Sequence, residues 1–267
     1  MTRVELAARG KSPKFAPLSV TTITMTAVFD LGKFTTIPIE ALKNAADLAR
    51  EMNMTVDEPK TKRRRKDAYV REVVQEKRRF RNQASLRHGG KSAKIFYNGS
   101  LHVTGCASPK DFVDVAVAVA SFVRAATGIE LTPKSVSIQM INAGTTILDA
   151  ATGFPVKFRP RTLSSEAVAA GFVADFDSER HPGVKLPLHD ENGSKVATTC
   201  VFQTGSVSII GARTPRHLAA AFENLVNVIG ACAHIAEPSG EMRTTTSKKQ
   251  LDFSFGYPSA AYDACCA

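Results

Sequence analysis

The sequence contains an internal repeat, and this repeat constrains the fold more than any other feature of the chain. Residues 96–105 read FYNGSLHVTG and residues 202–211 read FQTGSVSIIG, so Phe, Gly, Ser and the final Gly coincide. The correspondence continues downstream, because the pair at 108–109 (Ser-Pro) matches the pair at 214–215 (Thr-Pro), and an apolar stretch of helix length follows each pair. The repeat therefore predicts two halves with the same succession of elements.

Each copy of the repeat has the pattern of a β-hairpin followed by a helix. Asn98-Gly99 and Thr204-Gly205 are turn signals between β-branched segments. The strands expected around these turns end at 95–97 and 200–202 and return at 101–104 and 207–210.

Helix-start signals follow each hairpin. Ser108 and Thr214 suit the N-cap position, and the proline after each suits the first helical position, where a missing N–H is tolerated. Asp111 adds an acid at the capping-box position of the first copy. We expect helices over about 109–126 and 215–233.

Weaker patterns precede each hairpin. The expected elements are a strand over 19–28 with a helix over 38–52, and a strand over 136–141 with a helix over 164–171. The predicted organisation is a flexible N-terminus (1–17), a first repeat (18–132) with a basic insert at about 53–94, a second repeat (133–235) and a C-terminal tail (236–267).

The positive charge of the chain is concentrated in one segment. The 267 residues carry a net charge of +10, from 35 basic and 25 acidic side chains. Residues 60–94 hold fourteen of the basic residues and only three acids, so the rest of the chain is close to neutral. Such a block is either a solvated loop or the binding surface for a polyanion, of which nucleic acid is the first candidate.

Several classes of protein are disfavoured by the sequence. No run of 18 apolar residues exists, which argues against a membrane helix, and Glu5 interrupts any signal peptide. The five cysteines are odd in number and lack C-x-x-C spacing, which favours free thiols in a reducing, intracellular compartment. Common catalytic motifs and metal-ligand spacings are missing, so we expect no enzyme activity, no metal and no cofactor.

The duplicated hairpin and the helix after it resemble the TATA-binding protein family. Residues 200–212 (CVFQTGSVSIIGA), followed by AFENL at 221–225, are similar to the family signature IFxSGKxVxTGA…AFExI. The resemblance spans about residues 18–232. The basic insert and an expansion near 190–195 are more like the divergent members found in large nucleocytoplasmic DNA viruses. The resemblance implies an α+β saddle: a curved antiparallel sheet of two pseudo-symmetric repeats, with helices on its convex face.

The resemblance also implies a DNA-binding face in the first repeat. The family inserts pairs of phenylalanines between base steps in the minor groove, where hydrogen bonding distinguishes few sequences and apolar wedges replace base stacking. Phe96 and Phe80 match one such pair, and Arg79 and Arg81 flank Phe80 as phosphate contacts. The remaining matches are Arg87 as a phosphate contact and His102 and Thr104 on the groove floor. An ordinary hairpin aromatic is the alternative interpretation of Phe96.

The second repeat matches the family less well. Phe202 matches a wedge, and His181 stands where its partner phenylalanine is expected, although an exposed turn residue is an alternative interpretation of this histidine. Ser208 and Ile210 take the groove-floor positions. The sequence departs from the family at the central asparagines, expected near Ile23 and Met140, at the paired lysines, which are Ser100 and Ser206, and at an arginine lost in the run 185–188.

By resemblance, the chain is expected to be a transcription initiation factor that binds and bends promoter DNA. The expected partners are A·T-rich double-stranded DNA, a TFIIB-like factor and RNA polymerase, and the chain is expected to be a monomer. The expected location is the host cell nucleus, the viral factory or the virion. The alternative is a protein-interaction scaffold in a transcription complex or virion. A nuclease or glycosylase is disfavoured, because the repeats leave no room for a catalytic domain.

Overall fold

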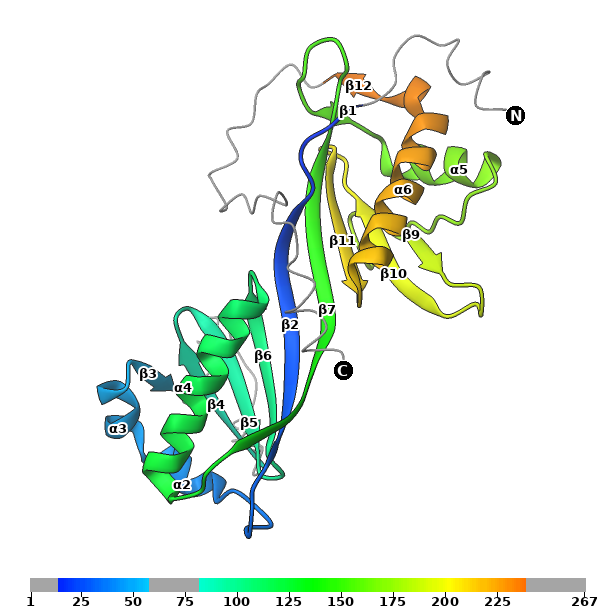
Figure 1. Ribbon diagram of the computed structural model, residues 1–267. Helices are drawn as coiled ribbons and strands as arrows, with labels where there is room; N and C mark the ends of the chain where they lie inside the picture. The colour runs from blue at the N-terminus through cyan, green and yellow to red at the C-terminus, as the bar shows by residue number, and fades with distance from the viewer. Residues whose placement is uncertain (1–13, 58–81, 239–267) are drawn as a thin grey trace, which may run out of the picture. The chain divides into compact units, whose positions relative to one another are not determined.

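The computed structural model describes residues 14–57 and 82–238, which form two compact units (Figure 1). The N-terminal unit comprises residues 25–137, and the C-terminal unit comprises residues 14–24 and 138–238. Two long strands, β2 (Ser19–Asp30) and β7 (Thr132–Leu148), each contribute residues to both units.

The N-terminal unit is a sheet in the order β3-β4-β5-β6-β2, and helix α4 lies against it (Figure 1). Pairing is antiparallel from β3 to β6. The elements are α2 (Ile39–Asn44), α3 (Ala46–Glu51), β3 (Met54–Val56), β4 (Gln83–His88), β5 (Lys91–Phe96), β6 (Ser100–Cys106) and α4 (Pro109–Thr127).

Alternation along the strands builds the core of this unit. Two alternate residues in each of β4, β5 and β6 are fully buried, whereas their neighbours along the strand are half-buried or exposed. The buried strand residues are Ala84, Leu86, Ala93, Ile95, Leu101 and Val103, and α4 buries Phe112, Val115, Val119, Phe122 and Val123. One face of the sheet is thus packed and the other is open.

The C-terminal unit repeats this arrangement with strands in the order β7-β11-β10-β9 and helix α6 against them (Figure 1). These strands pair antiparallel, and β1 pairs with β7. The elements are β1 (Lys14–Phe15), β8 (Val156–Lys157), α5 (Pro160–Ala169), β9 (Val184–His189), β10 (Lys195–Val201), β11 (Ser206–Ala212), α6 (Pro215–Ala231), the 3-10 helix η2 (Ala233–Ile235) and β12 (Glu237–Pro238).

The two hairpin glycines occupy equivalent positions, and both positions are crowded. Gly99 and Gly205 have φ angles of +80° and +75°, which side-chain-bearing residues rarely adopt. A Cβ at Gly99 would lie 2.7 Å from the carbonyl oxygen of Phe29, and one at Gly205 would collide with the carbonyl oxygen of Val156. Both turns therefore require glycine for conformation and for space.

The helix-start predictions are confirmed. Ser108 caps α4 in a complete capping box with Asp111, and the Thr214 hydroxyl accepts a hydrogen bond of 3.1 Å from the N–H of His217 at the start of α6. Each helix has proline in its first turn. The α+β class and the antiparallel sheet are also confirmed.

Other elements differ from the sequence-based predictions. The helix expected over 38–52 is two short helices separated at Ala45, whose ψ of 39° is not helical although no glycine or proline marks the break. The strand expected over 136–141 extends across all of β7. The stretches 1–17 and 236–267, which showed no pattern, contain the short strands β1 and β12. The helix α5 begins at Pro160, earlier than expected.

No helix within 14–57 and 82–238 combines the length and apolar character that spanning a membrane requires.

Candidate nucleic-acid interface

The open face of the N-terminal sheet carries most of the residues that the sequence singled out in the first repeat. Cross-strand neighbours form three rows on this face: Arg87–Ser92–Thr104, Ser85–Lys94–His102 and Gln83–Phe96. Because side chains alternate across a strand, these residues point away from the core that α4 covers. The structure thus brings Arg87, Phe96, His102 and Thr104 onto one surface, which we call the N-terminal open face.

The cations on this face are accessible. Lys94 is exposed, and the Arg87 side chain is 53% exposed. The Arg87 Nε donates a hydrogen bond of 2.8 Å to the Asp57 carboxylate. An ion pair at the surface contributes no more than about 1 kcal/mol, so a phosphate could compete for the guanidinium.

Phe96 lies at the end of β5, half-buried, and its nearest ring neighbour in the described part of the chain is His102. The two ring centres are 5.1 Å apart with planes inclined by 58°. The aromatic pair thus stands on the open face and outside the helix-covered core. The expected partner Phe80, with Arg79 and Arg81, lies outside the described residues.

The open face of the C-terminal sheet is also built from rows of cross-strand neighbours, but its chemistry differs. Its rows are Lys185–Cys200–Ser208–Gly144 and Pro187–Thr198–Ile210. The predicted groove-floor residues Ser208 and Ile210 both lie here, and Ile210 is 42% exposed. Lys185 is the cation in these two rows, and it is half-buried. This C-terminal open face is therefore mainly apolar and hydroxylic.

His181 and Phe202 are close together at the end of this sheet, as the resemblance implies for a wedge pair. Their ring centres are 5.6 Å apart, and Gly183 lies beside both rings, so that a Cβ there would be 3.1 Å from the Phe202 ring. The His181 Nδ1 accepts a hydrogen bond of 3.0 Å from the Gly183 N–H. His181 is half-buried and lies between the turn at 178–180 and the bend at 182–183.

The positions of the expected central asparagines, Ile23 on β2 and Met140 on β7, both lie in the C-terminal unit but have different surroundings. Ile23 is buried on the core side of β2. Met140 is half-buried on β7, two residues from Asn142. The Asn142 Oδ1 accepts a hydrogen bond of 3.1 Å from the Gly211 N–H, next to an irregularity in the pairing of β11 with β7. This asparagine therefore stabilises the sheet.

The cysteines do not form a nucleophilic site in the described part of the chain. Cys106, Cys200 and Cys232 are free and buried. Burial raises the pKa of the Cys106 and Cys232 thiols to about 11, and it also raises the pKa of Cys200, against the influence of Lys185. Protonated, buried thiols are poor nucleophiles. No cluster of metal-ligating side chains is present within the described ranges either.

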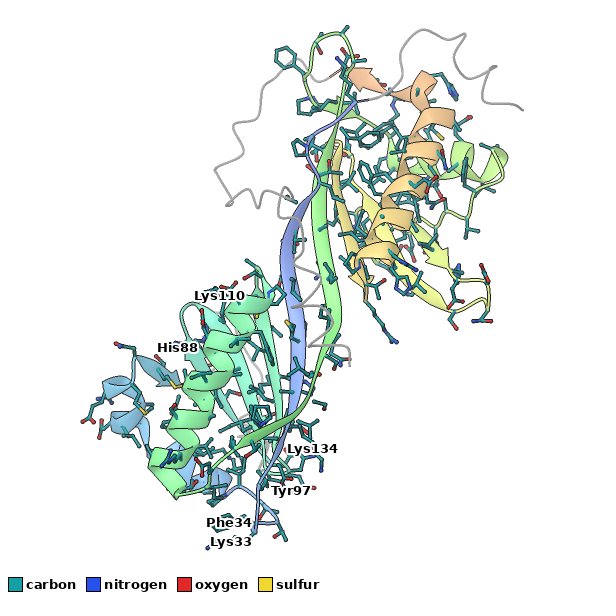
Figure 2. All side chains as sticks on the ribbon, in the orientation of Figure 1. Lys33, Phe34, His88, Tyr97, Lys110 and Lys134 are labelled. Carbon is teal, nitrogen blue, oxygen red and sulfur yellow. The ribbon has the colours of Figure 1, made fainter. Side chains whose placement is uncertain are left out.

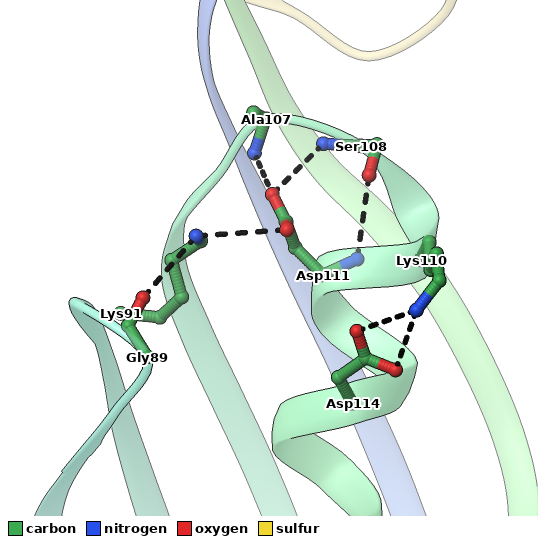
Figure 3. A network of polar contacts seen from close by, with 7 residues as sticks. All are labelled: Gly89, Lys91, Ala107, Ser108, Lys110, Asp111 and Asp114. Atoms are coloured by element: carbon green, nitrogen blue, oxygen red, sulfur yellow. Dashed lines mark hydrogen bonds and ion pairs between the residues drawn. The ribbon is translucent and has the colours of Figure 1, made fainter.

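The polar network at the start of α4 is structural (Figure 3). Asp111 accepts hydrogen bonds from the N–H groups of Ala107 at 2.6 Å and Ser108 at 3.3 Å, and Lys91 lies 3.5 Å from its other oxygen. Burial alone would raise the pKa of Asp111, but these donors outweigh burial and lower it. The carboxylate therefore caps the helix in its ionised form.

Sequence reasoning left several open-face residues without a role. The sequence places Lys94 in the basic segment without giving it a role of its own, and it assigns no role to Ser85, Ser92 or Gln83. The sequence feature that could have identified Lys94 and its neighbours as surface residues is the period-two pattern of β5. In this strand Ala93 and Ile95 are buried, and the residues that alternate with them face outward.

Comparisons with known proteins find similar solved structures but no matching sequence family. No protein-family model and no curated protein matches the sequence. A solved structure of the TBP of Methanococcus jannaschii is similar over 80% of this chain and 98% of that chain, with 15% sequence identity and a TM-score of 0.49. At this level, the similarity assigns neither a family nor a function to the chain.

Proposed function

We propose that the chain is a transcription initiation factor like the TATA-binding proteins, which binds promoter DNA in the minor groove and bends it with aromatic side chains. In this proposal the two repeats, 18–132 and 133–235, act together as a non-enzymatic, monomeric DNA-binding protein. Its protein partners are a TFIIB-like factor and RNA polymerase, and it acts where transcription takes place, in the nucleus or a viral factory.

One observation carries the proposal: Phe96 shares the N-terminal open face with Arg87, Lys94 and Thr104. A protein that kinks a duplex needs an apolar ring to replace lost base stacking, and cations to hold the phosphates while the duplex bends. Hydroxyl groups add hydrogen bonds to the groove and backbone. The sequence resemblance assigns the same roles to Phe96, Arg87 and Thr104, independently of the packing.

The C-terminal open face supports a weaker version of the same role. Phe202 and His181 supply an aromatic pair with ring centres 5.6 Å apart, but Lys185 is the single cation in the rows of this face. We therefore propose that the N-terminal unit contributes most of the electrostatic attraction to DNA.

The experiment that tests the proposal is DNA bending by variants that lack the aromatic rings. Phe96→Ala and Phe202→Ala should each reduce bending of an A·T-rich duplex, measured by energy transfer between its ends. Val117→Ala is the matched control, because Val117 is 61% exposed on α4, which packs on the opposite face of the sheet. Unchanged bending in both folded phenylalanine variants would contradict the proposal.

A protein-interaction scaffold is the second candidate, and one surface favours it. Val113 and Val117 lie one helical turn apart on the outer side of α4 and are 54% and 61% exposed. If this is the main role, Val117→Asp would abolish association with a transcription protein and leave DNA binding unchanged.

A further inference from the structure

Two exposed aromatic rings stand on neighbouring turns of the N-terminal unit, and neither belongs to the three rows of its open face. Phe34 is 41% exposed in the turn after β2, and Tyr97 is 46% exposed in the β5–β6 turn. Every other phenylalanine and tyrosine of the described ranges is buried or half-buried. Exposure of two rings in one place is therefore a particular feature of this unit.

The structure holds these two turns together. The N–H of Ile37 donates a hydrogen bond of 2.8 Å to the carbonyl oxygen of Tyr97, and the N–H of Phe29 donates one of 3.0 Å to that of Gly99. Within the first turn, the N–H of Phe34 bonds the Leu31 carbonyl at 3.2 Å. The backbone that carries the rings is thus fixed, which lowers the entropy lost when a ligand orders the site.

Two lysines, Lys33 and Lys134, lie at the same end of the unit as the two rings (Figure 2). The Lys33 ammonium lies 5.5 Å from the centre of the Phe34 ring, and Figure 2 draws Lys134 toward the same end of the unit as Lys33, Phe34 and Tyr97. The segments 31–38, 96–100 and 132–135 contain no carboxylate side chain. The nearest acid in sequence, Asp30, accepts a hydrogen bond of 2.9 Å from the Gly32 N–H.

The surrounding side chains add hydroxyl groups to this surface. Thr35 and Thr36 are exposed in the same turn as Phe34, and Thr132 and Ser135 are exposed at the start of β7. Aromatic faces, lysines and hydroxyls suit a ligand that has flat rings and negative charges. Nucleotides have both.

We propose that this tip, defined by Lys33, Phe34, Tyr97 and Lys134, binds unpaired nucleotides. Bases within a duplex stack on each other and leave their faces covered, whereas single-stranded bases can stack on protein rings while lysines contact the phosphates. The tip thus goes beyond the proposed minor-groove role, because it requires single-stranded nucleic acid and uses different residues.

The test measures binding of a fluorescent oligothymidylate to the full chain. Phe34→Leu and Tyr97→Leu keep apolar bulk but remove the ring, and each should weaken binding about fivefold or more. Tyr97→Phe, which retains the ring, should bind like the wild type. Thermal melting of each variant checks that the exposed substitutions leave the fold intact. Unchanged affinity in the folded Phe34→Leu, Tyr97→Leu double variant would overturn the proposal.

Photocrosslinking separates the tip from the basic segment, which could also attract single strands. An oligonucleotide containing 5-iodouracil should crosslink to peptides that include Phe34 or Tyr97. Crosslinks confined to other peptides would contradict the proposal. The tip variants should leave duplex bending unchanged, and Phe96→Ala should leave oligothymidylate binding unchanged, so the two proposals fail independently.

Discussion

The two copies of the repeat differ far more on their open faces than in their backbones. Each forms a hairpin with glycine at a positive φ and then a long helix with a hydroxyl cap and proline in its first turn. The N-terminal open face nevertheless carries Arg87 and Lys94, whereas the corresponding C-terminal rows carry only Lys185. The comparison indicates that turn and cap residues are held by backbone geometry, while open-face residues can diverge without loss of the fold.

The largest expected effect on stability comes from replacing the hairpin glycine that both copies of the repeat share. Gly205→Ala should lower the free energy of unfolding by about 2–5 kcal/mol, because it combines an unfavourable φ with a collision at the Val156 carbonyl. Gly99→Ala should act similarly through Phe29. Chemical denaturation measures both.

A control for these two variants is Gly193→Ala, which also has a positive φ of +74° but no atom within 4 Å of the added Cβ. Its expected loss is about 1–2 kcal/mol. Equal losses for Gly193→Ala and Gly205→Ala would show that crowding at the hairpin turn does not matter.

The difference between the open faces predicts an asymmetric loss of DNA binding. The double variant Arg87→Ala, Lys94→Ala should reduce the slope of log affinity against log salt by about 2, since each removes one phosphate contact. Lys185→Ala should reduce it by about 1 at most, because Lys185 is half-buried. Anisotropy titrations over a range of salt concentrations measure the slopes, and a larger effect of Lys185→Ala would reverse the comparison.

The first turns of α4 and α6 also differ between the two units, and this difference predicts a smaller effect on stability. Asp111→Asn should destabilise the N-terminal unit by about 1 kcal/mol, because α4 loses its capping carboxylate. The C-terminal unit has no equivalent variant, since α6 has no acid in its first turn. The lowered pKa of Asp111 means that its stabilisation is present above the unfolded-state pKa and disappears as pH falls through the folded-state pKa. Melting curves of wild type and variant should therefore converge in acid; a difference that persists there would indicate a role other than capping.

The smallest expected effect concerns the thiols, which should behave alike in both units. Cys106, Cys200 and Cys232 should resist alkylation at neutral pH in the folded chain, because burial raises their pKa values. Mass spectrometry after brief exposure to iodoacetamide measures the modification. Rapid labelling of one of the three would identify a unit that opens locally.

Much of the local structure could be predicted from the sequence, because local interactions determine it. Ser108, Asp111 and Thr214 act as caps as expected, since capping depends on residues within one helical turn. The break at Ala45 could not be predicted, because alanine favours helix and the break accompanies burial of Ile39, Leu42 and Ala49. The full length of β7 was also missed. Its first four residues are all exposed and show no alternation, and beyond 141 the sequence contains Asn142 and Gly144, which are unfavourable in strands.

The candidate site could be predicted only in part. The resemblance identified Phe96, Arg87, His102 and Thr104, and alternation explains why they share a face. It could not identify the ion pair of Arg87 with Asp57, because these residues are thirty positions apart and meet only through the pairing of β3 with β4. The exposure of Phe34 and Tyr97 likewise depends on how two turns pack, which no sequence pattern records.

The most direct test of the proposed function compares A·T-rich and G·C-rich duplexes of equal length. Anisotropy over a range of salt concentrations would report affinity, and energy transfer between the duplex ends would report bending. The proposal predicts tighter binding to the A·T-rich duplex, accompanied by bending that persists as salt is raised until the complex dissociates. Equal, strongly salt-dependent binding to both duplexes without bending would contradict it and would leave charge alone as the basis of DNA binding.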